Sequence, residues 1–152
     1  MAGKVTVDYK AYVKKMRAAK TAREMVESWA DACDEGPIRE DMAKFGDEFV
    51  GVYIEKAPEI IKYFVQEPML ASLEQEDGLD PKTKELIMVA AIAGMKQSAG
   101  MVKHILAAMS QGATEREVLD TIHLVIYEHG KTSLTTFGPA LRTAFKQHKA
   151  SA

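Results

Sequence analysis

The stretch LDPKTKELIMVAAIAGMKQSAGMVKHILAAMSQGATEREVLDTIHLVIYEHG, residues 79–130, decides the fold. It contains three segments with the three-and-four spacing of apolar residues that is typical of helices. Asp80 before Pro81 indicates a helix start, Gly112 indicates a helix end, and Thr114 with Glu117 forms a capping-box pattern. We therefore expect helices over about residues 81–95, 98–111 and 114–127.

The rest of the chain has the same helical periodicity, and no run alternates as a half-buried strand would. Helices are expected over about residues 8–33 with a break near Thr21, over 37–56, and from Pro58 to Val65 with Pro68 ending it; Met69–Leu73 would allow another turn. FGPAL, residues 137–141, is expected to split the last helical segment, which restarts at Pro139. The sequence predicts an all-α fold, a bundle of roughly seven or eight helices.

Composition limits the classes of function. A chain of 152 residues is most simply one domain, and its net charge of −2 gives no electrostatic reason to bind nucleic acid or an anionic membrane. The longest apolar run, residues 86–95, is about half a membrane span. Cys33 is the only cysteine, so no internal disulfide can form. We expect a protein of the reducing cytoplasm.

Two side chains in the quoted stretch are candidates for acid–base chemistry. Glu85 enters a helix that is apolar nearly all round, where a carboxylate needs a partner. His104 shares a helix face with Gln97 and Gly100 at steps of three and four residues, and Gly100 would leave space between the other two. Each observation also has a structural explanation: a helix-start carboxylate, a hydrogen-bonded histidine and a close helix crossing.

Other side chains are candidates for substrate binding. Ser98 is the only hydroxyl within residues 96–104. His123 and Tyr127 share one edge of a helix, where they would either reach a pocket or pack as an aromatic pair. Together with Gln97 and Gly100 they form the predicted binding set. No short histidine pair supports a metal site, and neither a metal nor a cofactor is expected.

The quoted stretch resembles the carboxymuconolactone decarboxylase and alkylhydroperoxidase D superfamily. The redox branch of that family has a glutamate, eleven residues, a C-x-x-C pair, three residues and a histidine, followed by a glycine before the next helix. Glu85 and His104 stand at the glutamate and histidine positions, and QGATEREV, residues 111–118, matches the turn into the next helix. The resemblance implies a family core over residues 45–152 and an N-terminal helical extension over 1–44 within one domain.

The chain departs from the redox branch at its cysteines. Gln97 and Gly100 stand where the two cysteines would be, so thiol peroxidase chemistry is excluded in practice. The decarboxylase branch lacks the pair and works without a cofactor on an unsaturated carboxylated lactone. That resemblance implies a lyase, decarboxylase or isomerase with Glu85 and His104 as the acid–base pair. The alternative is a non-catalytic member that binds a small molecule or serves an assembly, with the same two residues as a buried structural pair.

The resemblance also implies a homo-oligomer, a trimer or hexamer. The family associates through the helices of its motif, and the helix after Pro81 is apolar nearly all round.

Overall fold

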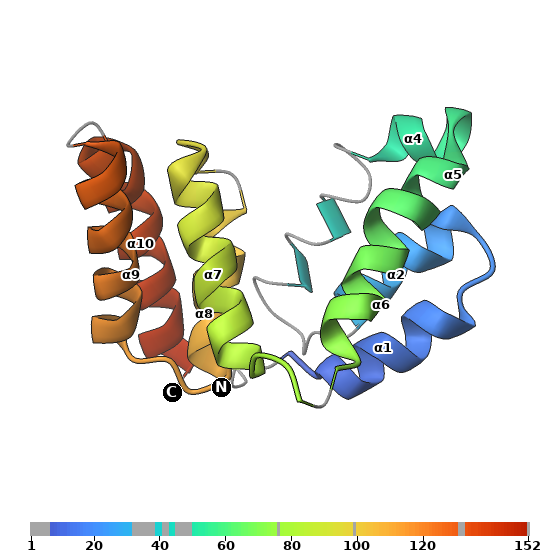
Figure 1. Ribbon diagram of the computed structural model, residues 1–152, viewed down its shortest axis with the longest axis horizontal. Coiled ribbons are helices and arrows are strands. Elements are labelled where there is room, and N and C mark those ends of the chain that lie inside the picture. Colours follow the sequence, from blue (N-terminus) through green and yellow to red (C-terminus); the bar gives the residue numbers. More distant parts are fainter. Residues whose placement is uncertain are drawn as a thin grey trace. The chain divides into compact units, whose positions relative to one another are not determined.

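The computed structural model describes residues 7–31, 39–40, 43–44, 50–75, 77–98, 100–130 and 133–151. Within these ranges every regular element of four or more residues is a helix, as the sequence predicts (Figure 1). The chain divides into two compact units, an N-terminal unit over Val7–Gly78 and a C-terminal unit whose described residues begin at Leu79. Cys33, and Met42, Phe45 and Phe49 of the helix predicted over residues 37–56, lie outside the described residues.

The N-terminal unit consists of short helices around a core of its own. The elements are α1 (Tyr9–Ala18), α2 (Ala22–Asp31), α4 (Gly51–Lys56), α5 (Pro58–Ile61), the π-helical segment η1 (Lys62–Gln66) and α6 (Glu67–Leu73). The predicted break near Thr21 is confirmed, because α1 ends at Ala18 and α2 begins at Ala22. The core contains Tyr12, Met16, Ala22, Met25, Val26, Trp29, Ile61 and Leu70.

Pro68 does not end the helix, contrary to the sequence prediction. The helical backbone runs without a gap from Pro58 through η1 to Leu73. A proline ring inside a regular helix clashes with the carbonyl four residues before it. Here the backbone N–H of Glu67 donates to the Lys62 carbonyl, five residues back, so the chain is locally wider just before Pro68. The π turn therefore accommodates the proline.

Basic side chains of α1 lie on its solvated surface. Lys15 Nζ is 3.0 Å from an Asp31 oxygen, and the Arg17 guanidinium donates to both carboxylate oxygens of Glu74. The Glu74 carboxylate raises the pKa of Arg17 through these hydrogen bonds. Lys15 and Arg17 of α1 thus each contact an acidic residue of the same unit.

The C-terminal unit is a ring of four helices. These are α7 (Pro81–Gly94), α8 (Met101–Ser110), α9 (Glu115–His129) and α10 (Ser133–Ser151). α7 packs on α8 and α9, and α10 packs on the same two helices, so α7 and α10 lie opposite each other across the ring (Figure 1). The fully buried side chains of the C-terminal unit include Val89, Met101, Ile105, Leu106, Val118 and Phe137.

Local signals at the ends of these helices are confirmed. The Asp80 side chain accepts from the backbone N–H of Thr83 at the start of α7, with Pro81 in the first turn. Thr114 and Glu117 form the complete capping box of α9. Gly112, just after α8, has φ +93°, the left-handed conformation that glycine adopts at lowest cost.

Pro139 does not split the last helix, which is a second correction. α10 runs from Ser133 to Ser151 with Pro139 inside it. Gly138 precedes the proline and has no side chain, which reduces the steric conflict that disfavours helical backbone before proline. Phe137, Ala140 and Ala144 are buried on both sides of the proline. Packing within the bundle therefore holds the segment as one helix.

No helix among the described residues combines the length and apolar character needed to cross a membrane.

The division into one extension over 1–44 and one core over 45–152 stays a prediction.

Candidate functional site

Glu85 of α7 and His104 of α8 form a hydrogen-bonded pair inside the C-terminal unit. Nδ1 of His104 lies 2.7 Å from Oε2 of Glu85, a distance typical of charge-assisted bonds. The two side chains are 22% and 12% exposed. The direction of this hydrogen bond depends on the tautomer of the ring: when the carboxylate is ionised it only accepts, and the imidazole then donates from Nδ1. The two predicted catalytic residues are therefore in contact, partly removed from water and still reachable from it.

The start of α7 determines where Glu85 lies. Asp80 Oδ1 accepts the Thr83 N–H at 3.1 Å, which caps the helix and fixes its first turn. Hydrogen bonds from the Thr83 hydroxyl and N–H lower the pKa of Asp80. Glu85 follows one turn into the helix, close to the positive end of the helix dipole.

The turn between α7 and α8 has an unusual backbone. Lys96 has φ +57°, and it is the only described non-glycine residue with positive φ. The Lys96 N–H donates to the Ala93 carbonyl at 2.9 Å, and the Gln97 N–H donates to the Ile92 carbonyl at 3.2 Å. This is a Schellman ending in which a lysine occupies the position that usually holds glycine. The sequence gives no sign of it, because glycine is the residue expected there.

This turn corrects the prediction for Gln97. α8 begins at Met101 and not at Ser98, so Gln97 is not on a shared helix face with His104. Gln97 and Ser98 lie in the turn and are exposed. The left-handed backbone at Lys96 and at Gly100 explains why the helix starts later than the apolar spacing predicts.

Gly100 is the N-cap residue of α8 and has φ +78°. A side chain here would be strained by the backbone alone. A Cβ at this position would also lie 3.2 Å from Cε of Lys103, which folds back over the helix start. The space that Gly100 leaves is therefore beside Lys103, one residue before His104.

His123 and Tyr127 are placed by the structure on the outer surface of α9. His123 is exposed, and Tyr127 is 81% exposed. The alternative that His123 and Tyr127 pack as a buried aromatic pair is therefore wrong. Of the predicted residues, the structure brings Glu85 and His104 together and leaves Gln97, Ser98, His123 and Tyr127 on solvent-exposed surfaces.

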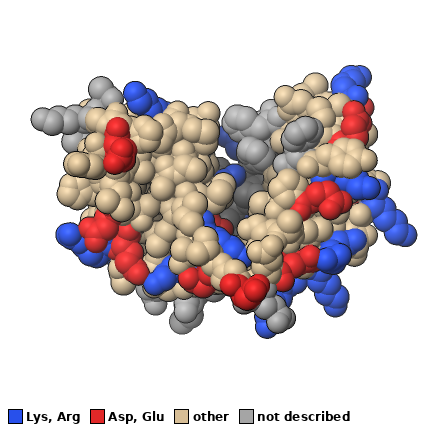
Figure 2. Space-filling model, viewed as in Figure 1, with Lys and Arg blue, Asp and Glu red and all other residues tan. Residues whose placement is uncertain are grey.

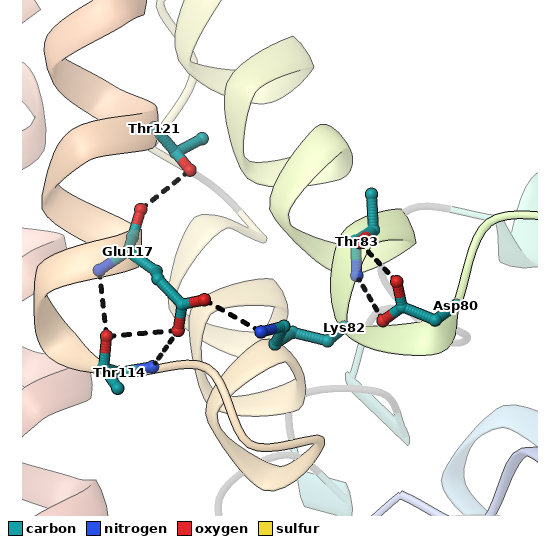
Figure 3. A network of polar contacts seen from close by, with 6 residues as sticks. All are labelled: Asp80, Lys82, Thr83, Thr114, Glu117 and Thr121. Carbon is teal, nitrogen blue, oxygen red and sulfur yellow. Dashed lines mark hydrogen bonds and ion pairs between the residues drawn. The ribbon is translucent and has the colours of Figure 1, made fainter.

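Sequence reasoning missed one polar contact close to the pair. Lys82 Nζ of α7 lies 2.8 Å from Oε1 of Glu117 of α9 (Figure 3). The hydrogen bond from Lys82, with those from the N–H and hydroxyl of Thr114, lowers the pKa of Glu117 to about 2. A lysine in the first turn of a helix is disfavoured by the dipole, and that was the available signal that Lys82 has an acidic partner elsewhere.

Among the residues that the structure describes, no group of three or more His, Cys, Asp and Glu side chains could hold a metal ion.

Comparison with known protein families gives one match. The family model described as "Carboxymuconolactone decarboxylase family" matches residues 64–147. Comparisons with curated proteins and with solved structures gave no match. The matched region contains Glu85, His104, the helices α7, α8 and α9, and α10 as far as residue 147. Because the family model covers more than half of the 152 residues and the fold is helical, the chain belongs to the carboxymuconolactone decarboxylase family.

Proposed function

We propose that this protein is a cofactor-free enzyme that decarboxylates or isomerises a small carboxylated metabolite, with Glu85 and His104 as its acid–base pair. The observation that carries the proposal is the 2.7 Å contact between His104 Nδ1 and Glu85 Oε2. A histidine oriented by a carboxylate is the usual arrangement for moving protons near neutral pH.

The two residues have different roles in the proposal. Glu85 accepts from Nδ1, which fixes the ring orientation and leaves Nε2 to exchange a proton with the substrate. Glu85 also stabilises the positive charge that His104 carries when it is protonated. The His104 side chain is 22% exposed and the Glu85 side chain 12% exposed, so both groups lie where interactions between charges are stronger than in bulk water.

For decarboxylation, the reaction balances with these groups alone. The bond between the substrate carbon and its carboxylate breaks, carbon dioxide leaves, and the electron pair passes into a conjugated carbonyl to form an enolate. Protonated His104 then gives the Nε2 proton to the carbanionic carbon, and water returns a proton to the imidazole. Isomerisation uses the same histidine first as base and then as acid.

The turn before α8 is the proposed place for the substrate's polar groups. Gln97 and Ser98 are exposed there and offer an amide and a hydroxyl. Lys103 lies partly buried over Gly100 and supplies positive charge beside His104. We assign the attraction of the substrate carboxylate to Lys103, since KTKELIM and KQSAGMVKH contain lysines and no arginine.

Self-association through α7 and α9 belongs to the same proposal. The outward faces of these packed helices hold large apolar side chains with 43–81% of their surface exposed: Ile87, Met88, Met95, Leu119, Leu124 and Tyr127. Figure 2 shows mostly uncharged surface over α7 and α9. We propose that copies of the chain, a trimer or hexamer, cover these faces in the cytoplasm.

The test is a panel of unsaturated carboxylated lactones and conjugated acids, followed by ultraviolet absorbance and by release of carbon dioxide. Turnover by the wild type should fall by about 10²–10⁴-fold in His104→Ala, as for loss of a general acid or base. His148→Gln, which removes a histidine from α10, is the matched control and should keep the wild-type rate. Binding of these acids without turnover would instead favour the non-catalytic alternative.

A further inference from the structure

The bridge between Lys82 and Glu117 joins α7 to α9 within one continuous network. Oε1 of Glu117 lies 2.8 Å from Lys82, while Oε2 accepts the Thr114 N–H at 2.8 Å and the Thr114 hydroxyl at 3.1 Å. The backbone carbonyl of Glu117 accepts from the Thr121 hydroxyl at 2.9 Å. The carboxylate that receives Lys82 is thus held rigidly by the cap of its own helix (Figure 3).

α7 needs such an anchor because its apolar surface does not fix its rotation. Val89 and Ile92 are buried, whereas Ile87 and Met88, of similar chemistry, are 49% and 43% exposed. A turn of α7 about its axis would exchange one apolar set for another at low cost in burial free energy. Specific polar contacts must therefore make one rotation preferred.

Two polar contacts of α7 lie one turn apart. Lys82 reaches α9, and Glu85, three residues later, reaches His104 of α8. Residues three apart are neighbours on a helix surface, so fixing Lys82 fixes the direction in which Glu85 projects. The unfavourable place of a lysine in the first turn of a helix is also explained if the contact with Glu117 has this purpose.

We infer that Lys82 and Glu117 are positioning residues that hold the Glu85 carboxylate in line with Nδ1 of His104. This inference rests on the proposed function of the Glu85–His104 pair. Neither residue touches substrate in this assignment; each acts through the rotation of α7.

The experiment determines which ring nitrogen of His104 carries the proton, and it needs no substrate. Imidazole ¹⁵N and ¹H resonances of the full chain are recorded at alkaline pH, where the ring is neutral. In the wild type the bond to Glu85 should keep the proton on Nδ1, and Glu85→Ala should move it to Nε2. Lys82→Met should shift the His104 resonances towards those of Glu85→Ala, and Lys82→Arg should restore the wild-type pattern. Glu117→Gln keeps an acceptor for Thr114 and should act like Lys82→Met.

Lys149→Met is the matched control. It breaks a bridge of the same kind, since Lys149 Nζ lies 3.2 Å from Glu115 Oε1, but it does not involve α7. This variant should leave the His104 resonances unchanged. If Lys82→Met and Glu117→Gln lower the melting temperature and leave the Nδ1 proton in place, the bridge is only structural and the inference is wrong. If wild-type His104 already carries its proton on Nε2, the pair itself fails, and the proposed function fails with it.

Discussion

Oε2 of Glu85 lies 2.7 Å from Nδ1 of His104, although the two residues are 19 positions apart and on different helices. The contact depends on two helix starts. Asp80 caps α7 through Thr83, and Gly100 begins α8 in a left-handed conformation. A substitution at the start of either helix should therefore change the contact between Glu85 and His104.

Peroxide chemistry gives the first prediction. The wild-type protein should show no thiol-dependent peroxidase activity beyond what the thiol of Cys33 gives, because Gln97 and Gly100 occupy the family's cysteine positions. A coupled assay with a dithiol reductant and an organic hydroperoxide measures it. Turnover that persists in Cys33→Ser would contradict the prediction.

Glu117 should make stability depend on acidity. Its pKa is lowered from 4.5 to about 2, so its contribution to folding is complete above pH 4.5 and is lost as the pH falls towards 2. Glu117→Gln should be less stable than the wild type at pH 7, and the difference should narrow between pH 4.5 and 2 in urea unfolding. In the Lys82→Met background the same substitution should show a smaller change with pH. If the difference in unfolding free energy between the wild type and Glu117→Gln stays constant with pH, the lowered pKa of Glu117 is not its cause.

Lys96 should be a position where glycine stabilises the fold. Its φ of +57° is costly for a residue with a side chain. Lys96→Gly should raise the free energy of unfolding by about 0.5–1 kcal/mol. Lys146→Gly, an exposed lysine within α10, should lower it by about 1 kcal/mol. Equal losses at both positions would mean that the backbone strain at Lys96 is not relieved by glycine.

The exposed apolar faces of α7 and α9 should be covered in solution. Light scattering should give a multiple of the 16.8 kDa chain mass at micromolar concentration. Met88→Glu and Leu124→Glu should shift the protein towards the monomer, because a charge buried in an apolar interface is costly. Arg142→Glu, on exposed α10 surface, is the control and should not. A wild-type particle of about 17 kDa would remove the proposal.

Helix starts and ends that depend on nearby residues were predictable from the sequence. Asp80 with Pro81, the Thr114–Glu117 box and Gly112 each act within one turn, so their spacing is enough to recognise them. The Glu85–His104 contact was predicted from the family resemblance, because spacing along one chain does not bring two helices together.

Other features depend on contacts between helices, which local patterns do not contain. Pro139 stays inside α10 because neighbours such as Phe137 pack into the bundle. Pro68 is accommodated by a π turn that no residue type specifies. The place of Lys82 in the first turn of a helix indicates an acidic partner, but only the packing of α9 on α7 shows that the partner is Glu117.

We propose that Glu85 and His104 are a working catalytic pair and not only a structural one. The most direct measurement compares turnover and the free energy of urea unfolding in His104→Ala and Glu85→Gln. For a working pair, turnover should fall by about 10²-fold or more while the unfolding free energy changes by less than about 1 kcal/mol. A purely structural pair would give the opposite result. Stability would then fall by about 1–3 kcal/mol, as for buried polar groups left without partners, while turnover or binding of the acids stays unchanged. That outcome would contradict the catalytic role of the pair.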